Sequence, residues 1–227
     1  MKASRPQTIN AYPTLPIFYA SNHLSCFQNY RTCFFAIDRK GPNLLAMEAA
    51  FKEWRVVVDA LGRGDQIVIM RKGGIDEGEK GFEIKHHQFW LFPTLFHQQK
   101  DFVIPIAARH MTLHPDDPII PIQYHCEVVA HYELTQLEQI KKMRGQHVWK
   151  DEVLIQRMSS GDNHQLHALL VRVSKLSHAV EIPLDENYGG CRSWIRLKEN
   201  LDSSDCTPIL DQDHFNEKIQ AFKNSIA

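Results

Sequence analysis

The chain has 227 residues, enough to bury a hydrophobic core in one large domain or two small ones. Hydrophobic residues make up 43% and charged residues 23%, a composition typical of soluble globular proteins. The formal net charge of −1 excludes a global positive field that would draw the whole chain onto nucleic acid or a membrane. Any basic binding site must therefore be local.

Residues 1–46 differ in composition from the rest of the chain. They hold five cations and a single acid, and four prolines interrupt any helix. Their apolar patch CFFAI is too short for the core of a signal peptide. We expect a poorly ordered N-terminal extension; a transit peptide and a true start codon at Met47 are the alternatives.

The first element expected after this extension is a helix that begins at Met47. Its apolar stripe has helical spacing and consists of Phe51, Trp54, Val58 and Leu61. Gly62 follows at the place of a left-handed C-cap. The next segment, IVIM (67–70), is apolar on both faces and predicts a central strand.

A second strand is expected over 88–92, ended by Pro93, and Thr94 then caps a short helix through Gln99. Several prolines mark a connector over about 103–121. The segment before the connector is marginal for a separate core, so we expect the halves on its two sides to share one core.

Beyond the connector, apolar and polar residues alternate over 122–132 and predict a strand with one buried face. A capping box from Thr135 to Glu138 starts a helix that Gly145 closes. Apolar runs predict two further strands, and helical spacing predicts two further helices. These elements are a helix near 151–158, strands over 166–176 and 193–197, and a helix over 215–226.

The elements together predict an α+β fold of short, mostly antiparallel strands with peripheral helices, for which a small barrel-like sheet is one arrangement. The folded domain is expected to span 47–198, in two halves. A C-terminal tail, 199–227, carries the last helix.

An anion site is one interpretation of the RKGG sequence that follows the strand at 67–70. Gly73 and Gly74 reach positive φ without penalty, so their N–H groups are able to converge on an anion. Arg71 adds a fork suited to phosphate or carboxylate, and Lys72 adds a point charge. The alternative is a hairpin turn with solvated cations, since no complete phosphate-loop motif occurs in the chain.

Further cations stand beside aromatic residues. Arg157 follows Trp149 by one short helix, and Arg192 precedes Trp194. Arg172 lies inside an apolar strand, where a cation needs a partner or an opening. A cleft that collects Arg157, Arg172 and Arg192 with the RKGG turn beside Trp194 would suit a nucleobase and its phosphate.

A metal-dependent nuclease is the second hypothesis. Asp65 followed by Glu83 and Lys85 matches the carboxylates and lysine with which restriction-type nucleases hold Mg²⁺ and orient water. The tripeptide E-x-K is very common, and a solvated strand face is the favoured explanation.

Metal and disulfide frameworks are not predicted. Among the thirteen histidines, His110 and His114 have i,i+4 spacing, but the second precedes a proline of the connector, a poor setting for a rigid zinc-binding pair. A composite site of His147, Cys191 and Cys126 is the alternative. The five cysteines are widely spaced without a C-x-x-C pair, which fits a reducing cytosol.

Five ordered motifs resemble a known family: EWRVVVDALGRGDQIVIMRKGGI, FWLFPTLFHQ, HVWKDEVLIQR, LLVRVSKL and YGGCRSW. Over about residues 47–198 the chain resembles the bacterial domain of unknown function 1802 family. That family has no assigned activity, so the resemblance transfers no site residues. Some members are joined to restriction-endonuclease domains, which implies a restriction–modification context and a restriction-type nuclease as partner.

A cytoplasmic nucleic-acid- or nucleotide-binding module, with DNA or RNA as its partner, is the function that these observations favour. No cofactor is predicted, and Mg²⁺ enters only with the nuclease hypothesis. A protein–protein adaptor without a ligand site is the third hypothesis.

Overall fold

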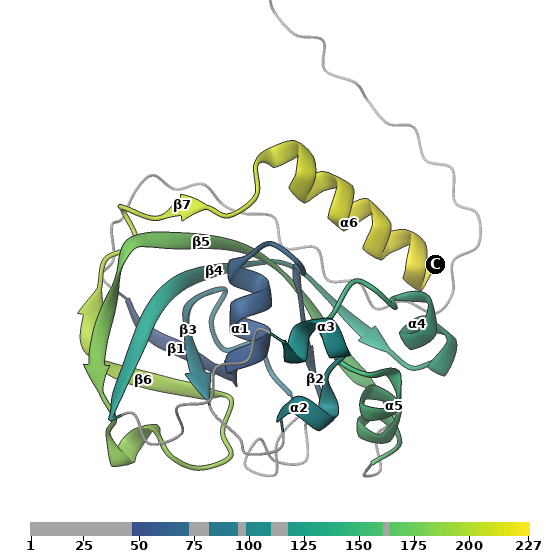
Figure 1. Cartoon of the computed structure of the whole chain (residues 1–227), viewed down its shortest axis with the longest axis horizontal. Helices are drawn as coiled ribbons and strands as arrows, with labels where there is room; N and C mark the ends of the chain where they lie inside the picture. Colours follow the sequence, from purple (N-terminus) through teal and green to yellow (C-terminus); the bar gives the residue numbers. More distant parts are fainter. Residues whose placement is uncertain (1–46, 73–81, 95–98, 110–117, 161–163) are drawn as a thin grey trace, which may run out of the picture.

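A computed structural model describes residues 47–72, 82–94, 99–109, 118–160 and 164–227 (Figure 1). Its strands form one mixed sheet of seven strands in the order β2-β5-β4-β3-β1-β6, with β7 paired to β5. Every pairing is antiparallel except that of β1 with β3. The predicted α+β fold with mostly antiparallel strands is confirmed, and the sheet is open, not a closed barrel.

The strands are β1 (Met47–Trp54), β2 (Val68–Arg71), β3 (Gln88–Thr94), β4 (Ile119–Leu134), β5 (Leu166–Pro183), β6 (Trp194–Leu201) and β7 (Thr207–Pro208). The helices are α1 (Arg55–Gly62), α2 (Gln99–Phe102), α3 (Pro105–Ala108), α4 (Leu137–Lys142), α5 (Asp151–Ser159) and α6 (Gln212–Ile226), with a 3₁₀ turn η2 at Glu186–Tyr188. The helices predicted near 151–158 and 215–226 and the strands predicted at 67–70, 88–92, 122–132, 166–176 and 193–197 are all present.

Two of the strands are long instead of short. β4 has 16 residues and β5 has 18, and they pair along nearly their whole length. The register shifts between Ile122 and Tyr124 and again between Val128 and Ala130. Such bulges increase local twist and bend the strands, so this ribbon curves around the rest of the sheet (Figure 1).

The middle of the sheet is buried on both faces. Phe51 and Phe89 pack into a larger cluster with α1, α5 and α6, whereas their neighbours Ala50 and Trp90 pack into a second cluster with η2 and β6. Successive residues of a strand point to opposite faces, so an apolar run serves both clusters. The larger cluster takes residues from both sides of the proline connector.

The predicted start of the first helix is wrong. Residues Met47–Trp54 form strand β1, and helix α1 begins at Arg55. Phe51 and Trp54 therefore do not share a helical face with Val58. The spacing of the apolar residues was ambiguous because a strand that runs directly into a helix combines the strand period of 2 with the helix period of 3.6. Pairing with β3 and β6 determines that Met47–Trp54 forms a strand.

Three smaller predictions also differ from the structure. The strand at 67–70 is an edge strand, because β2 pairs with β5 alone. The left-handed glycine after α1 is Gly64 (φ 73°) and not Gly62. The capping box of α4 is formed by Gln136 and Gln139, one residue later than predicted, while Gly145 does adopt the left-handed conformation (φ 87°).

Two predictions lie wholly or partly outside the described residues. These are the N-terminal extension over 1–46 and the helix between Thr94 and Gln99, where the described residues resume with α2.

Candidate functional site

Arg71 ends strand β2 and reaches across to β1. Its guanidinium carbon lies 4.5 Å from the centre of the Phe51 ring, and Nη2 donates a hydrogen bond to the Lys52 carbonyl. The same Nη2 lies 3.7 Å from Oε2 of Glu53. Although three strands lie between β2 and β1 in the sheet order, the end of β2 is thus close to the strand that carries Lys52 and Glu53.

Glu53 is a carboxylate inside the protein. The residue is 1% exposed, and its Oε1 accepts a hydrogen bond of 2.7 Å from the backbone N–H of Trp54. Its Oε2 has no hydrogen-bond partner. A buried carboxylate is costly unless cations compensate it, and Arg71 is the nearest such cation.

Arg157 brings a second guanidinium to Glu53 from helix α5. Its guanidinium carbon lies 4.0 Å from the centre of the Trp149 ring and 5.4 Å from that of Trp54. Burial lowers the pKa of Arg157, Glu53 opposes this, and the charge of Arg71 lowers it further. The two arginines therefore act on one another around a single carboxylate.

Lys52 extends the group of cations toward strand β6. Its ammonium donates a hydrogen bond of 2.7 Å to the Gly190 carbonyl. Burial lowers the pKa of Lys52, and the positive charges of Arg192 and Arg71 lower it further. Lys52, Glu53, Arg71, Arg157 and Arg192 are called the cationic cluster below.

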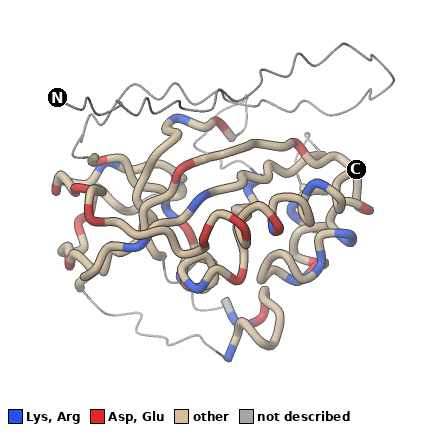
Figure 2. The backbone as a smooth tube through the Cα atoms, turned by 90° about the horizontal axis from the view of Figure 1, so that it is seen from above, with Lys and Arg blue, Asp and Glu red and all other residues tan. Residues whose placement is uncertain are grey.

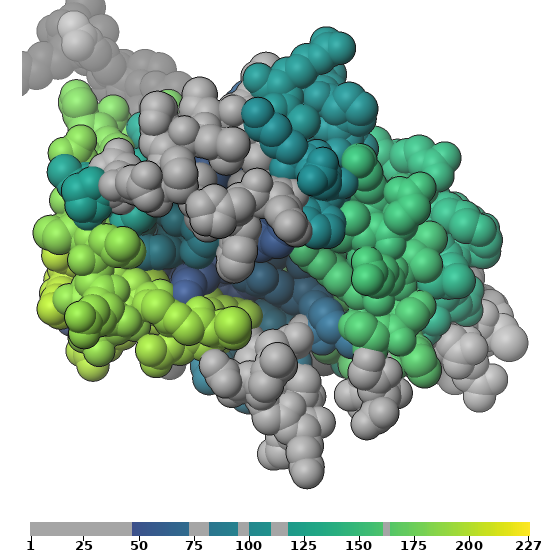
Figure 3. Space-filling model, turned by 60° about the horizontal axis from the view of Figure 1, so that its bottom comes forward, coloured from purple at the N-terminus to yellow at the C-terminus, as the bar shows by residue number. Residues whose placement is uncertain are grey.

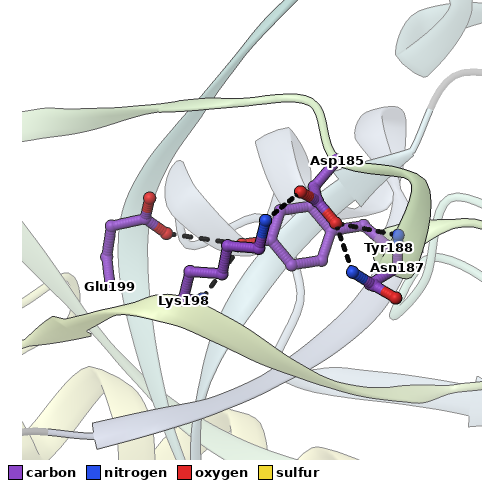
Figure 4. Close-up of polar contacts among 5 residues, drawn as sticks. All are labelled: Asp185, Asn187, Tyr188, Lys198 and Glu199. Atoms are coloured by element: carbon purple, nitrogen blue, oxygen red, sulfur yellow. Dashed lines mark hydrogen bonds and ion pairs between the residues drawn. The ribbon is translucent and has the colours of Figure 1, made fainter.

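The segment that carries Arg192 is fastened to β6 by polar contacts (Figure 4). Asp185 accepts hydrogen bonds from the backbone and side chain of Asn187 and forms an ion pair with Lys198. The Tyr188 hydroxyl accepts from the Lys198 backbone N–H at 3.0 Å and donates to Glu199 at 3.4 Å. These contacts hold the turn before Gly190 against the sheet.

The cationic cluster draws its residues from β1, β2, α5 and the turn before β6. Figure 3 shows purple and blue atoms of the early chain set back between the yellow-green part around β6 and the green part around α5. Elsewhere basic and acidic residues are interspersed along the described chain (Figure 2). The positive charge is therefore local, as the net charge of −1 requires.

Lys72 follows Arg71 and is anchored by helix α5 and by the residue that precedes β5. Its ammonium donates to the carbonyls of Met158 and Gln165, each at 3.2 Å. Burial lowers the pKa of this lysine. Gly73 and Gly74, which follow it, lie outside the described residues.

The structure brings together some of the residues that the sequence suggested and separates others. Arg71, Arg157 and Arg192 join the cluster. Arg172 lies apart from the cluster. Its guanidinium carbon lies 4.8 Å from the centre of the Phe215 ring, and it donates a hydrogen bond to Gln212; both partners belong to α6. These contacts give the cation of this otherwise apolar strand its partners.

Trp194 packs in the core next to the cluster and does not form an exposed wall of a binding cleft. It is 8% exposed, it packs on Phe51 at 4.8 Å and on Phe89 at 5.1 Å, and its indole N–H donates to the Glu83 carbonyl. Phe51, which contacts both the Arg71 guanidinium and Trp194, lies at the junction of the cluster and the core.

Lys52 and Glu53 are the members of the site that sequence reasoning missed. Both were placed on a helix beginning at Met47, whereas they lie on strand β1. A charged pair inside the otherwise apolar AAFKEW segment was the available signal, because a strand buried on both faces has little room for charges.

The residues of the nuclease hypothesis do not have the expected setting. Glu83 and Lys85 are exposed and precede β3 without belonging to a strand, and Asp65 accepts from Nε of Arg63 at 2.8 Å. No three His, Cys, Asp or Glu side chains are grouped to hold a metal within the described ranges.

The chain belongs to the family described as Domain of unknown function (DUF1802), whose sequence profile matches residues 50–221. The resemblance inferred from the five motifs is thereby confirmed. No curated protein matches the chain. No helix among the described residues is long and apolar enough to cross a membrane.

Among solved structures, the chain is similar to the crystal structure of ASCH from Zymomonas mobilis, with 11% identity and a TM-score of 0.42 over 78% of this chain and 95% of that one. A mutant of the same Zymomonas mobilis protein is similar at 10% identity, with a TM-score of 0.41 over 78% and 97% of the two chains. The names of this family and of these two structures do not refer to a restriction enzyme, so they give no support to the restriction–modification context.

Proposed function

We propose that this protein is a nucleic-acid- or nucleotide-binding module whose cationic cluster contacts phosphate. The observation that carries the proposal is the grouping of four cations from four separate segments. Arg71 and Arg157 act on the buried carboxylate of Glu53, while Arg71 and Arg192 both act on Lys52. Four cations with one carboxylate among them leave an excess of positive charge, and such a local excess attracts anions.

Unsatisfied polar atoms support a ligand at this place. Nε of Arg71 and Nε1 of Trp149, whose ring lies against Arg157, are buried donors without a hydrogen-bond partner. Such atoms are rare in native proteins, and each calls for a specific explanation. A phosphate group offers acceptor oxygens to the guanidinium and indole N–H groups.

Aromatic rings beside the cations suit a base attached to that phosphate. Trp54 is partly exposed, and its ring lies 4.8 Å from that of Trp149 and next to Arg157. Base stacking on aromatic rings combined with cations along the backbone is the usual arrangement for single-stranded nucleic acid. Lys72 stays within our proposed phosphate contacts, and Arg172 does not, because it lies under α6.

The test is the salt dependence of binding to a short labelled single-stranded RNA and the equivalent DNA. For the wild type, the logarithm of the affinity should fall linearly with the logarithm of the salt concentration, by about 0.7 per phosphate contacted. Arg192→Gln removes an exposed charge of the cluster, so its slope should be shallower by about 0.7.

Arg144→Gln is the control, because Arg144 is exposed, is paired with Asp151 and lies outside the cluster. It should keep the wild-type slope. The proposal fails if neither RNA, DNA nor mononucleotides bind at low salt, or if the two variants change the slope equally.

A further inference from the structure

A cleft that shares no lining residue with the cationic cluster lies near helix α3. It has a volume of about 530 Å³ and lies between the α1–β2 turn, helix α3 and the turn before Trp149, with Lys218 of α6 at its side. Figure 1 shows α3 beside the end of α1. The volume is within the range of small-molecule sites. We call it the α3 cleft.

The walls of the α3 cleft are held in place by backbone and side-chain hydrogen bonds. Ile104 N–H donates to the Val148 carbonyl at 2.9 Å, and the Gln66 side chain accepts from Val148 N–H at 3.0 Å and donates to the Val68 carbonyl at 2.7 Å. The cleft is therefore formed before any ligand arrives, which reduces the entropy cost of binding.

A buried histidine lines this cleft. His147 is 4% exposed, and neither ring nitrogen makes a hydrogen bond of ordinary geometry. Burial lowers its pKa, while the charge of Asp151 and the backbone of Trp149 act in the opposite direction. A neutral imidazole offers one N–H donor and one acceptor, and these groups are available to a ligand in the cleft.

An ammonium group lines the same cleft. Lys218 donates to the Asp65 backbone carbonyl at 3.0 Å and forms no ion pair with a described carboxylate. The neighbouring Arg63, in contrast, is already paired with the Asp65 side chain. The remaining wall is apolar, and Ile106, which is 62% exposed, stands at its edge.

We propose that the α3 cleft binds a small organic anion, namely a carboxylate carried on an apolar body. Lys218 would bind the carboxylate, His147 would hydrogen-bond to the same ligand, and the body would pack on Ile104, Ile106 and Ala107. The proposal is independent of nucleic-acid binding at the cationic cluster.

The experiment uses three probes and the full chain: 3-phenylpropionate, its neutral analogue 3-phenylpropanamide, and acetate, which lacks the apolar body. Binding is followed by NMR at the imidazole of His147 and the δ-methyl group of Ile106. We expect 3-phenylpropionate to shift both signals saturably, with a millimolar or tighter dissociation constant for a ligand of this size. The amide and acetate should each bind about tenfold more weakly.

Variants assign the two polar contacts. Lys218→Met keeps the aliphatic stem and removes the charge, so it should weaken 3-phenylpropionate about tenfold and abolish its preference over the amide. Lys141→Met, on exposed α4 surface outside the cleft, should change nothing. His147→Phe should weaken the binding of 3-phenylpropionate and of 3-phenylpropanamide. If this variant does not fold, the result with Lys218→Met still tests the proposal.

The proposal is overturned if 3-phenylpropionate leaves the His147 and Ile106 signals unchanged. It is also overturned if the amide binds as tightly as the acid to the wild type, because the site would then not select an anion.

Discussion

At the scale of single residues, Glu53 is central because its charge is surrounded by protein. Arg71 and Arg157 compensate it from two different elements, and the Trp54 N–H binds one of its oxygens. Removing one partner of a buried ion pair is more costly than never having had the pair, because the remaining charge keeps its desolvation cost. Glu53 therefore fixes where the two guanidinium groups lie.

Glu53→Gln should lower the free energy of unfolding by about 3 kcal/mol, because it leaves Arg71 and Arg157 without their counter-charge. Urea unfolding measures this loss. In the Glu53→Gln background, Arg71→Met should cost less than it does alone, since the pair is already broken. Additive losses in the double variant would show that the two side chains do not interact.

His125 on β4 gives the protein a predictable response to acid. Burial lowers its pKa from 6.5 to about 4, and its ring lies 5.3 Å from that of Trp90. Between these pH values the unfolded chain binds a proton that the folded chain does not. Stability should therefore fall as the pH drops from 6.5 to about 4, by at most about 3 kcal/mol from this residue.

His125→Phe should make that pH dependence shallower by up to one proton, as measured by urea unfolding at a series of pH values between 7 and 4. His178→Phe, on the exposed end of β5, serves as the control and should leave the slope unchanged. An unaltered slope in His125→Phe would contradict the neutral state of this buried ring.

At the scale of elements, close packing at the end of helix α1 leaves no room for a side chain at position 62. A Cβ atom at Gly62 would lie 2.2 Å from Cζ of Tyr124, which is shorter than any real contact. Glycine is thus needed at position 62 for close approach to β4, while the left-handed turn belongs to Gly64.

Gly62→Ala should lower the free energy of unfolding by about 1–3 kcal/mol, because the added methyl group displaces the Tyr124 ring. Denaturant unfolding of this variant and of Gly62→Ala with Tyr124→Leu provides the test. The smaller leucine should recover part of the loss. If the double variant is less stable by the full sum of the single effects, crowding against Tyr124 is not the cause.

The element scale also shows which local structure the sequence could predict. The stripe of Phe215, Phe222 and Ile226 and the alternation along β4 were readable because each element has a single period and one buried face. β1 was not readable, because it is buried on both faces and continues into a helix without a break.

At the scale of the whole molecule, the site depends on pairings that no local pattern contains. β1 lies between β3 and β6, and its parallel pairing with β3 sets Phe51 opposite Leu91. That arrangement carries Lys52 to the turn at Gly190 and Glu53 to Arg71. The sequence could name the arginines as candidates, but it could not show that Arg172 would be turned toward α6 while the others meet.

The most direct measurement of the central claim is a map of backbone amide NMR shifts during titration with a short single-stranded RNA. We predict that the largest saturable shifts occur at Lys52, Arg71 and Arg192 and in the last turn of α5, while Arg172 and the start of α6 do not change. Shifts concentrated around Arg172 and α6, or no saturable shifts at low salt, would contradict a nucleic-acid site at the cationic cluster.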